Sequence, residues 1–210
     1  MFKNLGAMMN FKRAFLFLEV AVFFFLTNIT LSFFRTSDFI PKPPTYLRIN
    51  LPDHYYHNEQ VACFVMLEAA DIFTLKNVST DNKGQCAQEI DLGPINGTLY
   101  LFYKAFNSQD SLAQLINISN DFIDDHKIKA DRIDFQQIID PKRRVFGTFF
   151  TLKGNVATNY QFYLTDSTSN FIRGEVLLNC KPNYDSLRPS LEYLKIDLLH
   201  LVNSLRWKKD

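Results

Sequence analysis

The chain has 210 residues, which is enough for one domain and a targeting segment. Hydrophobic residues make up 47% of the chain and aromatic residues 15%, which excludes a protein without a folded core. The net charge is +1, and the 19 basic and 21 acidic residues beyond residue 35 form no basic stripe, which argues against nucleic acid as a partner.

An apolar segment at residues 14–34 directly follows two basic residues. Sixteen of its 21 residues are apolar, which is closer to the roughly 20 of a spanning helix than to the roughly 7–15 of a signal peptide. Glu19 is costly in a bilayer, but near the cytoplasmic end it can reach the interface or be protonated. The preceding charges place the amino terminus in the cytoplasm and the rest of the chain outside it. We therefore predict a signal or signal-anchor helix in residues 1–35 and a proline-rich spacer in residues 36–44.

Residues 45–210 are predicted to form one α+β domain. Short apolar runs between turn residues are typical of strands and occur at 45–51, 62–69, 97–106, 132–139, 143–154, 159–166 and 171–180. The run at 97–106 is apolar on both faces, as in a central strand. Strands that follow one another in sequence indicate a mostly antiparallel sheet with helices packed on it.

Two amphipathic patterns predict the helices. The first begins at Asp110, its expected cap, and repeats apolar residues at spacings of three and four as far as His126. The second follows Asp185 or Ser186 and has leucines at 187, 191, 194, 198, 201 and 205, a continuous apolar seam. Pro189 is expected in its first turn, where a missing N–H costs little. We expect this helix to pack on the sheet rather than in a coiled coil.

The sequence contains none of the common catalytic motifs: no GxGxxG, P-loop, GxSxG, HExxH or CxxC. The one close histidine pair, His54 and His57, lacks further ligands for zinc, so we expect it in a solvent-facing loop. We expect no cofactor, no metal and no catalytic residue. The basic run 142–144 is expected to be a solvated turn. Four carboxylates are expected to be helix-end or strand-edge charges: Asp124, Asp125, Asp131 and Asp134.

Three cysteines occur, Cys63, Cys86 and Cys180. In an oxidising compartment two of them would tend to pair. Cys63 and Cys86 flank a polar excursion and are the disulfide candidates, whereas Cys180, on the inward register of the last strand, is expected to be a buried free thiol. Spacing does not fix connectivity, so the pairing stays open at this point.

Several stretches resemble the gliding-motility lipoprotein family GldD. They are PKPPTYLRINLP at 41–52, HKIKAD at 126–131, VFGTFFTLKGNVATNYQFYLTDS at 145–167 and KPNYDSLRPSLEYLKIDLLHLVNSLRW at 181–207. The resemblance implies a non-catalytic accessory of the gliding machinery and of its associated type IX protein secretion in Gram-negative gliding bacteria. Its partners would be other envelope proteins, and the family supplies no catalytic residue to carry over.

The chain departs from the family at its anchor. The lipid-bearing cysteine of the family is expected near Phe34 or Arg35, and no cysteine occurs here before Cys63. We therefore expect the apolar segment to remain as an inner-membrane anchor, or to be cut at an atypical site, with the domain in the periplasm. The alternative functions are a periplasmic small-molecule or peptidoglycan-binding module and an unrecognised envelope hydrolase. A deep cavity lined by converging polar groups would favour these.

Overall fold

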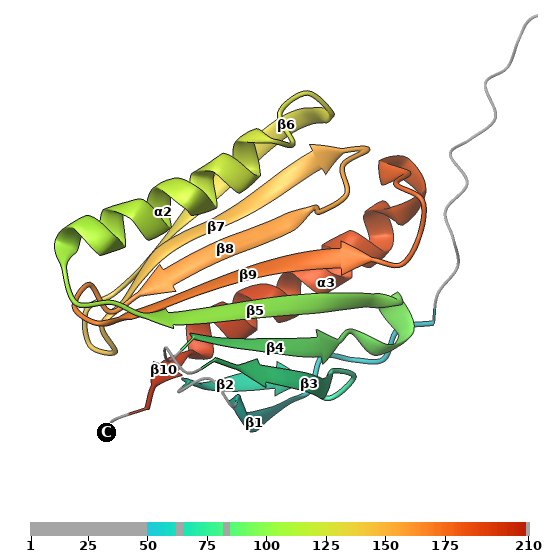
Figure 1. The fold of residues 1–210 in the computed structure, drawn as a ribbon. Helices are drawn as coiled ribbons and strands as arrows, with labels where there is room; N and C mark the ends of the chain where they lie inside the picture. The colour runs from blue at the N-terminus through green and yellow to red at the C-terminus, as the bar shows by residue number, and fades with distance from the viewer. Residues whose placement is uncertain (1–49, 62–64, 82–84, 209–210) are drawn as a thin grey trace, which may run out of the picture. The chain divides into compact units, whose positions relative to one another are not determined.

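The computed structural model of the chain describes residues 50–61, 65–81 and 85–208 (Figure 1). In these ranges the elements are β1 (Tyr56–Val61), β2 (Val65–Ala70), β3 (Thr74–Thr80), β4 (Gln85–Asp91), the short 3-10 helix η1 (Gly93–Ile95), β5 (Gly97–Ala105), α2 (Gln109–Asp124), β6 (Ala130–Asp140), β7 (Val145–Gly154), β8 (Tyr160–Thr165), β9 (Asn170–Leu178), α3 (Tyr184–Ser204) and β10 (Arg206–Trp207). All strand pairs among them are antiparallel. The predicted α+β class is therefore confirmed for this part of the chain.

The predicted membrane or signal helix at residues 14–34 lies outside the described residues, as does most of the strand expected at 45–51. No helix in the described part is both long and apolar enough to cross a membrane. The division of the chain into residues 1–35, 36–44 and 45–210 stays a prediction.

Seven strands form the large sheet, in the order β3-β4-β5-β9-β8-β7-β6. After β5 the chain passes through α2 to the far edge of the sheet, and the meander β6-β7-β8-β9 then returns to β5. β6 and β3 are therefore the two edge strands. The central strand predicted at 97–106 is β5, which lies between β4 and β9.

One face of this sheet forms the main core against α3. Leu99 on β5 lies opposite Ile90 on β4 and Val176 on β9, and all three are at most 1% exposed. The predicted leucine seam of α3 is confirmed: Leu191, Leu194, Leu198, Leu201 and Leu205 are buried in the same cluster. Full burial of one such side chain contributes about 1.5–3 kcal/mol, so this seam fixes the helix on the sheet.

A second sheet of three strands, β1-β2-β10, packs on α3 as well (Figure 1). Its last strand, β10, pairs with β2 through Arg206 and Trp207. The last described strand therefore lies beside the hairpin that contains the first two. The sequence patterns predicted neither β1 nor β10, because both are short and carry mixed polar and apolar residues.

Helix α2 covers the opposite face of the large sheet. Successive side chains of a strand point to opposite faces: on β9, Ile172 belongs to the core beneath α3, whereas Phe171 packs with Leu112 and Leu115 of α2. Farther along α2, Ile123 packs against Leu152 of β7.

Three details of the helices differ from the prediction. The cap of α2 is Ser108, whose side chain accepts a hydrogen bond from the Ser111 N–H, and the cap of α3 is Asn183. Because α3 begins at Tyr184, Pro189 lies in its second turn, where proline removes an intrahelical hydrogen bond. Each helix therefore begins earlier than its periodicity indicated, because short polar residues upstream cap it.

Candidate functional site

The predicted histidine pair is divided between two environments. His57 lies on β1, where its two ring nitrogens are 2.8 Å from an Asp71 carboxylate oxygen and 3.0 Å from a Glu59 carboxylate oxygen. The hydrogen bond to Asp71 outweighs burial and raises the pKa of His57. His54 instead turns toward α3. The expectation of a solvent-facing loop holds only in part: His54 lies in a loop before β1 and both rings are partly exposed, but His57 belongs to β1 and each ring is engaged by a carboxylate.

Asp197 of α3 is the partner of His54. Its carboxylate is fully buried, and its Oδ1 lies 2.6 Å from Nδ1 of His54 and accepts a 3.1 Å hydrogen bond from the Tyr56 hydroxyl. Burial, together with the negative charge of Asp197, raises the pKa of Tyr56 to about 12. The second carboxylate oxygen, Oδ2, has no partner among the described residues.

Stacked rings extend this cluster on both sides. The His54 ring lies over Tyr193 with centroids 4.2 Å apart, and the Tyr56 ring lies over His200 with centroids 3.6 Å apart. His200 Nε2 is 2.7 Å from a carboxylate oxygen of Glu68 on β2. We name the six residues the α3 clamp: His54, Tyr56, Glu68, Tyr193, Asp197 and His200. They join the β1-β2 hairpin to α3.

The α3 clamp contains an Asp–His couple but not the rest of a hydrolytic site. In nucleophilic catalysis the ring nitrogen opposite the carboxylate activates a hydroxyl or thiol within hydrogen-bond reach. Nε2 of His54 has no such partner in the part of the chain that the structure describes. The described residues also contain no group of three or more His, Cys, Asp or Glu side chains that could hold a metal ion. The geometry supports a fastening role, because it ties two elements together through charge-assisted hydrogen bonds.

The predicted carboxylate pairs do not converge on a site. Asp124 is paired with Lys127 at 2.6 Å at the end of α2. Asp134 on β6 is bound by Lys153 and Arg132, in that order of effect, and both lower its pKa. These side chains are charges at a helix end and a strand edge.

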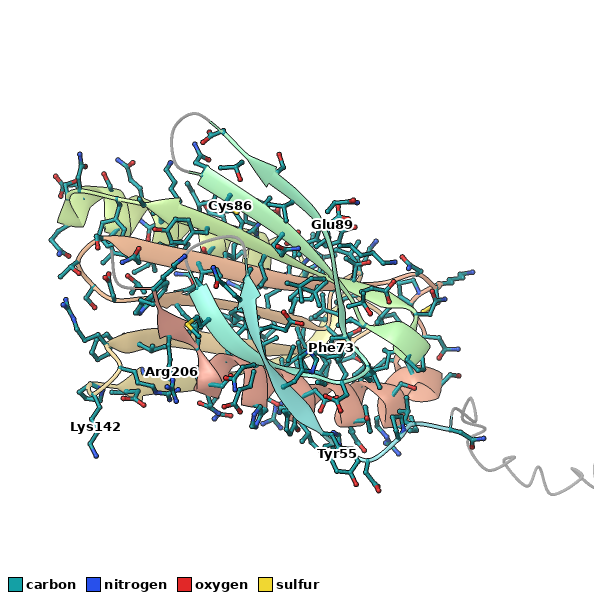
Figure 2. The ribbon with its side chains drawn as sticks, turned by 90° about the horizontal axis from the view of Figure 1, so that it is seen from below. Tyr55, Phe73, Cys86, Glu89, Lys142 and Arg206 are labelled. Atoms are coloured by element: carbon teal, nitrogen blue, oxygen red, sulfur yellow. The ribbon has the colours of Figure 1, made fainter. Side chains whose placement is uncertain are left out.

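The structure describes two of the three cysteines, Cys86 and Cys180. Cys86 lies buried on β4 and is not a free thiol (Figure 2). Cys63 lies outside the described residues, so its pairing with Cys86 stays a prediction. Cys180 is free but exposed, so the expectation of burial is wrong: β9 ends at Leu178, before its alternation reaches Cys180.

We predict that reduction of a Cys63–Cys86 disulfide lowers the free energy of unfolding by about 2–4 kcal/mol, the usual effect of losing a disulfide. Urea unfolding with and without reductant, in a Cys180→Ser background, measures the difference. That background substitution should itself change stability by less than about 0.5 kcal/mol, because the residue is exposed. Non-reducing peptide mapping that finds the Cys63 and Cys86 thiols free would refute the pairing.

An apolar groove lies between α2 and edge strand β6. Its cavity volume is about 390 Å³, and its walls include Leu112 and Ile116 of α2 and Ile139, Phe146 and Tyr163 of the sheet. We call it the β6 groove, together with Phe135, which lies four residues before Ile139 and on the same face of β6. Phe135 is 71% exposed and Ile139 65%. The sequence predicted this strand but gave no sign that it was an edge.

The two most specific motif stretches meet in space. The Asn155 side chain, after β7, accepts a 2.8 Å hydrogen bond from the backbone N–H of Tyr184, the first residue of α3. The Tyr160 hydroxyl on β8 donates to the Leu191 carbonyl of α3 at 2.7 Å. These two contacts therefore fasten the first half of α3 to the sheet.

The comparison with protein families gives one match. A family model described as "Gliding motility lipoprotein GldD" matches residues 36–207, most of the chain. Searches of curated proteins and of solved structures found no match.

Proposed function

Because this chain belongs to the GldD family of gliding-motility lipoproteins, we propose that it is a non-catalytic accessory of the gliding machinery and of its associated type IX protein secretion. Membership of this family implies a location in the cell envelope. We further propose that the apolar segment at residues 14–34 anchors the chain in the inner membrane, with the domain in the periplasm. The observations behind the anchor are the length of that segment and the absence of a cysteine before Cys63.

The β6 groove is the observation that best supports action through protein contacts. β6 is an 11-residue edge strand, and an edge strand presents unpaired N–H and C=O groups to an incoming strand. Phe135 and Ile139 leave large apolar surfaces in water beside that edge. The occupant we propose is an extended segment of another envelope protein, which adds a strand to β6 and places apolar side chains in the groove.

The α3 clamp distinguishes the proposed accessory role from the alternative of an envelope hydrolase. Its one buried carboxylate, Asp197, is used to hold Tyr56 and His54. A hydrolase that used His54 as its base would lose turnover on its removal even if folding were preserved. An accessory protein would not.

The test is a set of variants expressed in place of the natural protein in a gliding host. We expect Phe135→Lys with Ile139→Lys to reduce gliding and secretion to the level of a deletion strain, because lysine on an edge strand opposes pairing. The purified variant should keep its stability within about 0.5 kcal/mol, since both side chains are exposed. Ile128→Lys with Ile196→Lys, two exposed positions outside the groove, is the matched control and should glide normally.

Two outcomes decide the proposal. Normal gliding by the β6 double variant would remove the β6 groove as the contact surface. A stable His54→Asn variant that no longer glides would argue for catalysis instead.

The same strains test the anchor: the protein recovered from membranes should have the mass of the uncleaved chain, and a mature terminus near residue 35 would contradict it.

A further inference from the structure

A concave basic pocket lies where the β6-β7 turn comes close to strand β10. Its volume is about 570 Å³, within the range of small-ligand sites. Six of its lining residues are Lys142, Arg143, Arg144, Arg206, Trp207 and Lys208. Lys142 and Arg206 lie at the same end of the domain (Figure 2). The basic run 142–144, expected to be a solvated turn, is indeed a turn, but the fold brings it together with a second basic group more than 60 residues later in the sequence.

Little negative charge balances this pocket. Arg143 is paired with Asp140 at 2.7 Å. Within the described ranges no carboxylate lies within ion-pair distance of Lys142, Arg206 or Lys208. Gathering unpaired cations in one concavity costs free energy in the folded protein. An anion in the pocket would offset that cost.

One carboxylate lines the pocket, that of Asp166, and both of its oxygens are hydrogen-bonded within its own loop. Oδ1 of Asp166 accepts hydrogen bonds of 2.8–2.9 Å from three backbone N–H groups of its own loop, those of Thr168, Ser169 and Asn170. Oδ2 accepts from the Asn170 side chain at 2.8 Å. The loop therefore satisfies this carboxylate, and its oxygens are not available to bind the surrounding cations.

Arg144 is held in place before any ligand arrives. Arg144 Nη2 donates to two neutral acceptors, the Asp166 carbonyl at 3.3 Å and the Thr168 hydroxyl at 3.0 Å. Its backbone has a positive φ of 55°, and its carbonyl accepts a 2.9 Å hydrogen bond from the Trp207 indole. A guanidinium fixed by neutral partners keeps its full charge and its remaining donors.

We propose that this basic pocket binds a phosphate group, carried either by a lipid headgroup or by a small soluble molecule. Arginine presents planar paired donors that match phosphate oxygens, and lysine adds mobile positive charge. The proposal is independent of the protein contacts assigned to the β6 groove. It adds a second site, at a different place in the fold and for a different class of ligand.

The single tryptophan of the chain reports on the pocket directly, because Trp207 lines it. The full chain is purified in maltoside micelles, and its tryptophan emission is followed while inorganic pyrophosphate is added. We expect a saturable change that sodium chloride at equal ionic strength does not reproduce. A second titration adds phosphatidylglycerol to the micelles, with phosphatidylcholine for comparison.

The variant Lys142→Gln with Arg206→Gln should weaken binding at least tenfold. The matched control, Lys127→Gln with Lys129→Gln, removes two charges near the opposite end of β6 and should change binding less than twofold. A response to pyrophosphate assigns a soluble phosphate, and a response to phosphatidylglycerol alone assigns a headgroup. No saturable response to either probe, or equal weakening in both variants, overturns the proposal.

Discussion

Gly174→Ala is expected to destabilise the protein by about 3 kcal/mol, at the upper end of the usual cost of overpacking. A Cβ atom at Gly174 on β9 would lie 2.2–2.8 Å from three ring atoms of Phe162 on β8, far inside van der Waals contact. Phe162 is 2% exposed and lies beside the parallel ring of Phe149, so it has no space into which to retreat. The Phe162 ring therefore occupies the space that a side chain at Gly174 would need.

A double-mutant cycle separates this contact from a general intolerance of the strand. Phe162→Leu alone should cost about 1–3 kcal/mol through the cavity that it leaves. In the Phe162→Leu background, however, Gly174→Ala should cost much less than in the natural chain, a coupling of about 1–3 kcal/mol. Urea unfolding of the four proteins measures it. Strict additivity would show that the ring is not the obstacle.

Asp166→Asn is expected to lower the free energy of unfolding at pH 7 by about 2–3 kcal/mol, the size of lost hydrogen bonds to a charged group. Burial by itself opposes ionisation of this carboxyl. The hydrogen bonds from the N–H groups of Ser169, Asn170 and Thr168 outweigh that burial and hold the pKa of Asp166 far below its usual range. An amide at this position loses the charge, and its NH₂ group faces donors instead of acceptors.

The pH dependence follows from the direction of that pKa shift. Because the folded pKa lies below the unfolded value of about 3.9, the stabilisation is fully present above about pH 5 and is lost as the pH falls toward the folded pKa. The difference between natural protein and Asp166→Asn should therefore shrink between pH 5 and pH 2. Asp121→Asn, an exposed position on α2, is the control and should change stability by less than about 0.5 kcal/mol. A difference that is constant across this range would contradict the account.

Local sequence patterns predicted the parts of the fold that local physics determines. The apolar runs of β5, β8 and β9 and the leucine seam of α3 each bury one continuous face, and such a face is visible as a repeat along the chain. β3 and β4 were missed as strands because of their polar composition: they lie near or at one edge, where alternate side chains face water.

The candidate sites depend on contacts that no local pattern contains. Asp197 and His54 are 143 residues apart, and Lys142 and Arg206 meet only because β10 returns to the hairpin. Each of these residues reads alone as an ordinary surface charge. The family resemblance, by contrast, depends on order and spacing over many residues, and the family match over residues 36–207 confirms it.

The pairing of β10 with β2 has a consequence for how the molecule is made. Strand β2 lies near the start of the described domain and is flanked by β1 on one side and by Arg206 and Trp207 on the other. The small sheet therefore cannot be completed until Arg206 and Trp207 have been synthesised, after all the other described elements. A chain interrupted before Arg206 would lack the third strand, and β2 would be left without a partner on that edge.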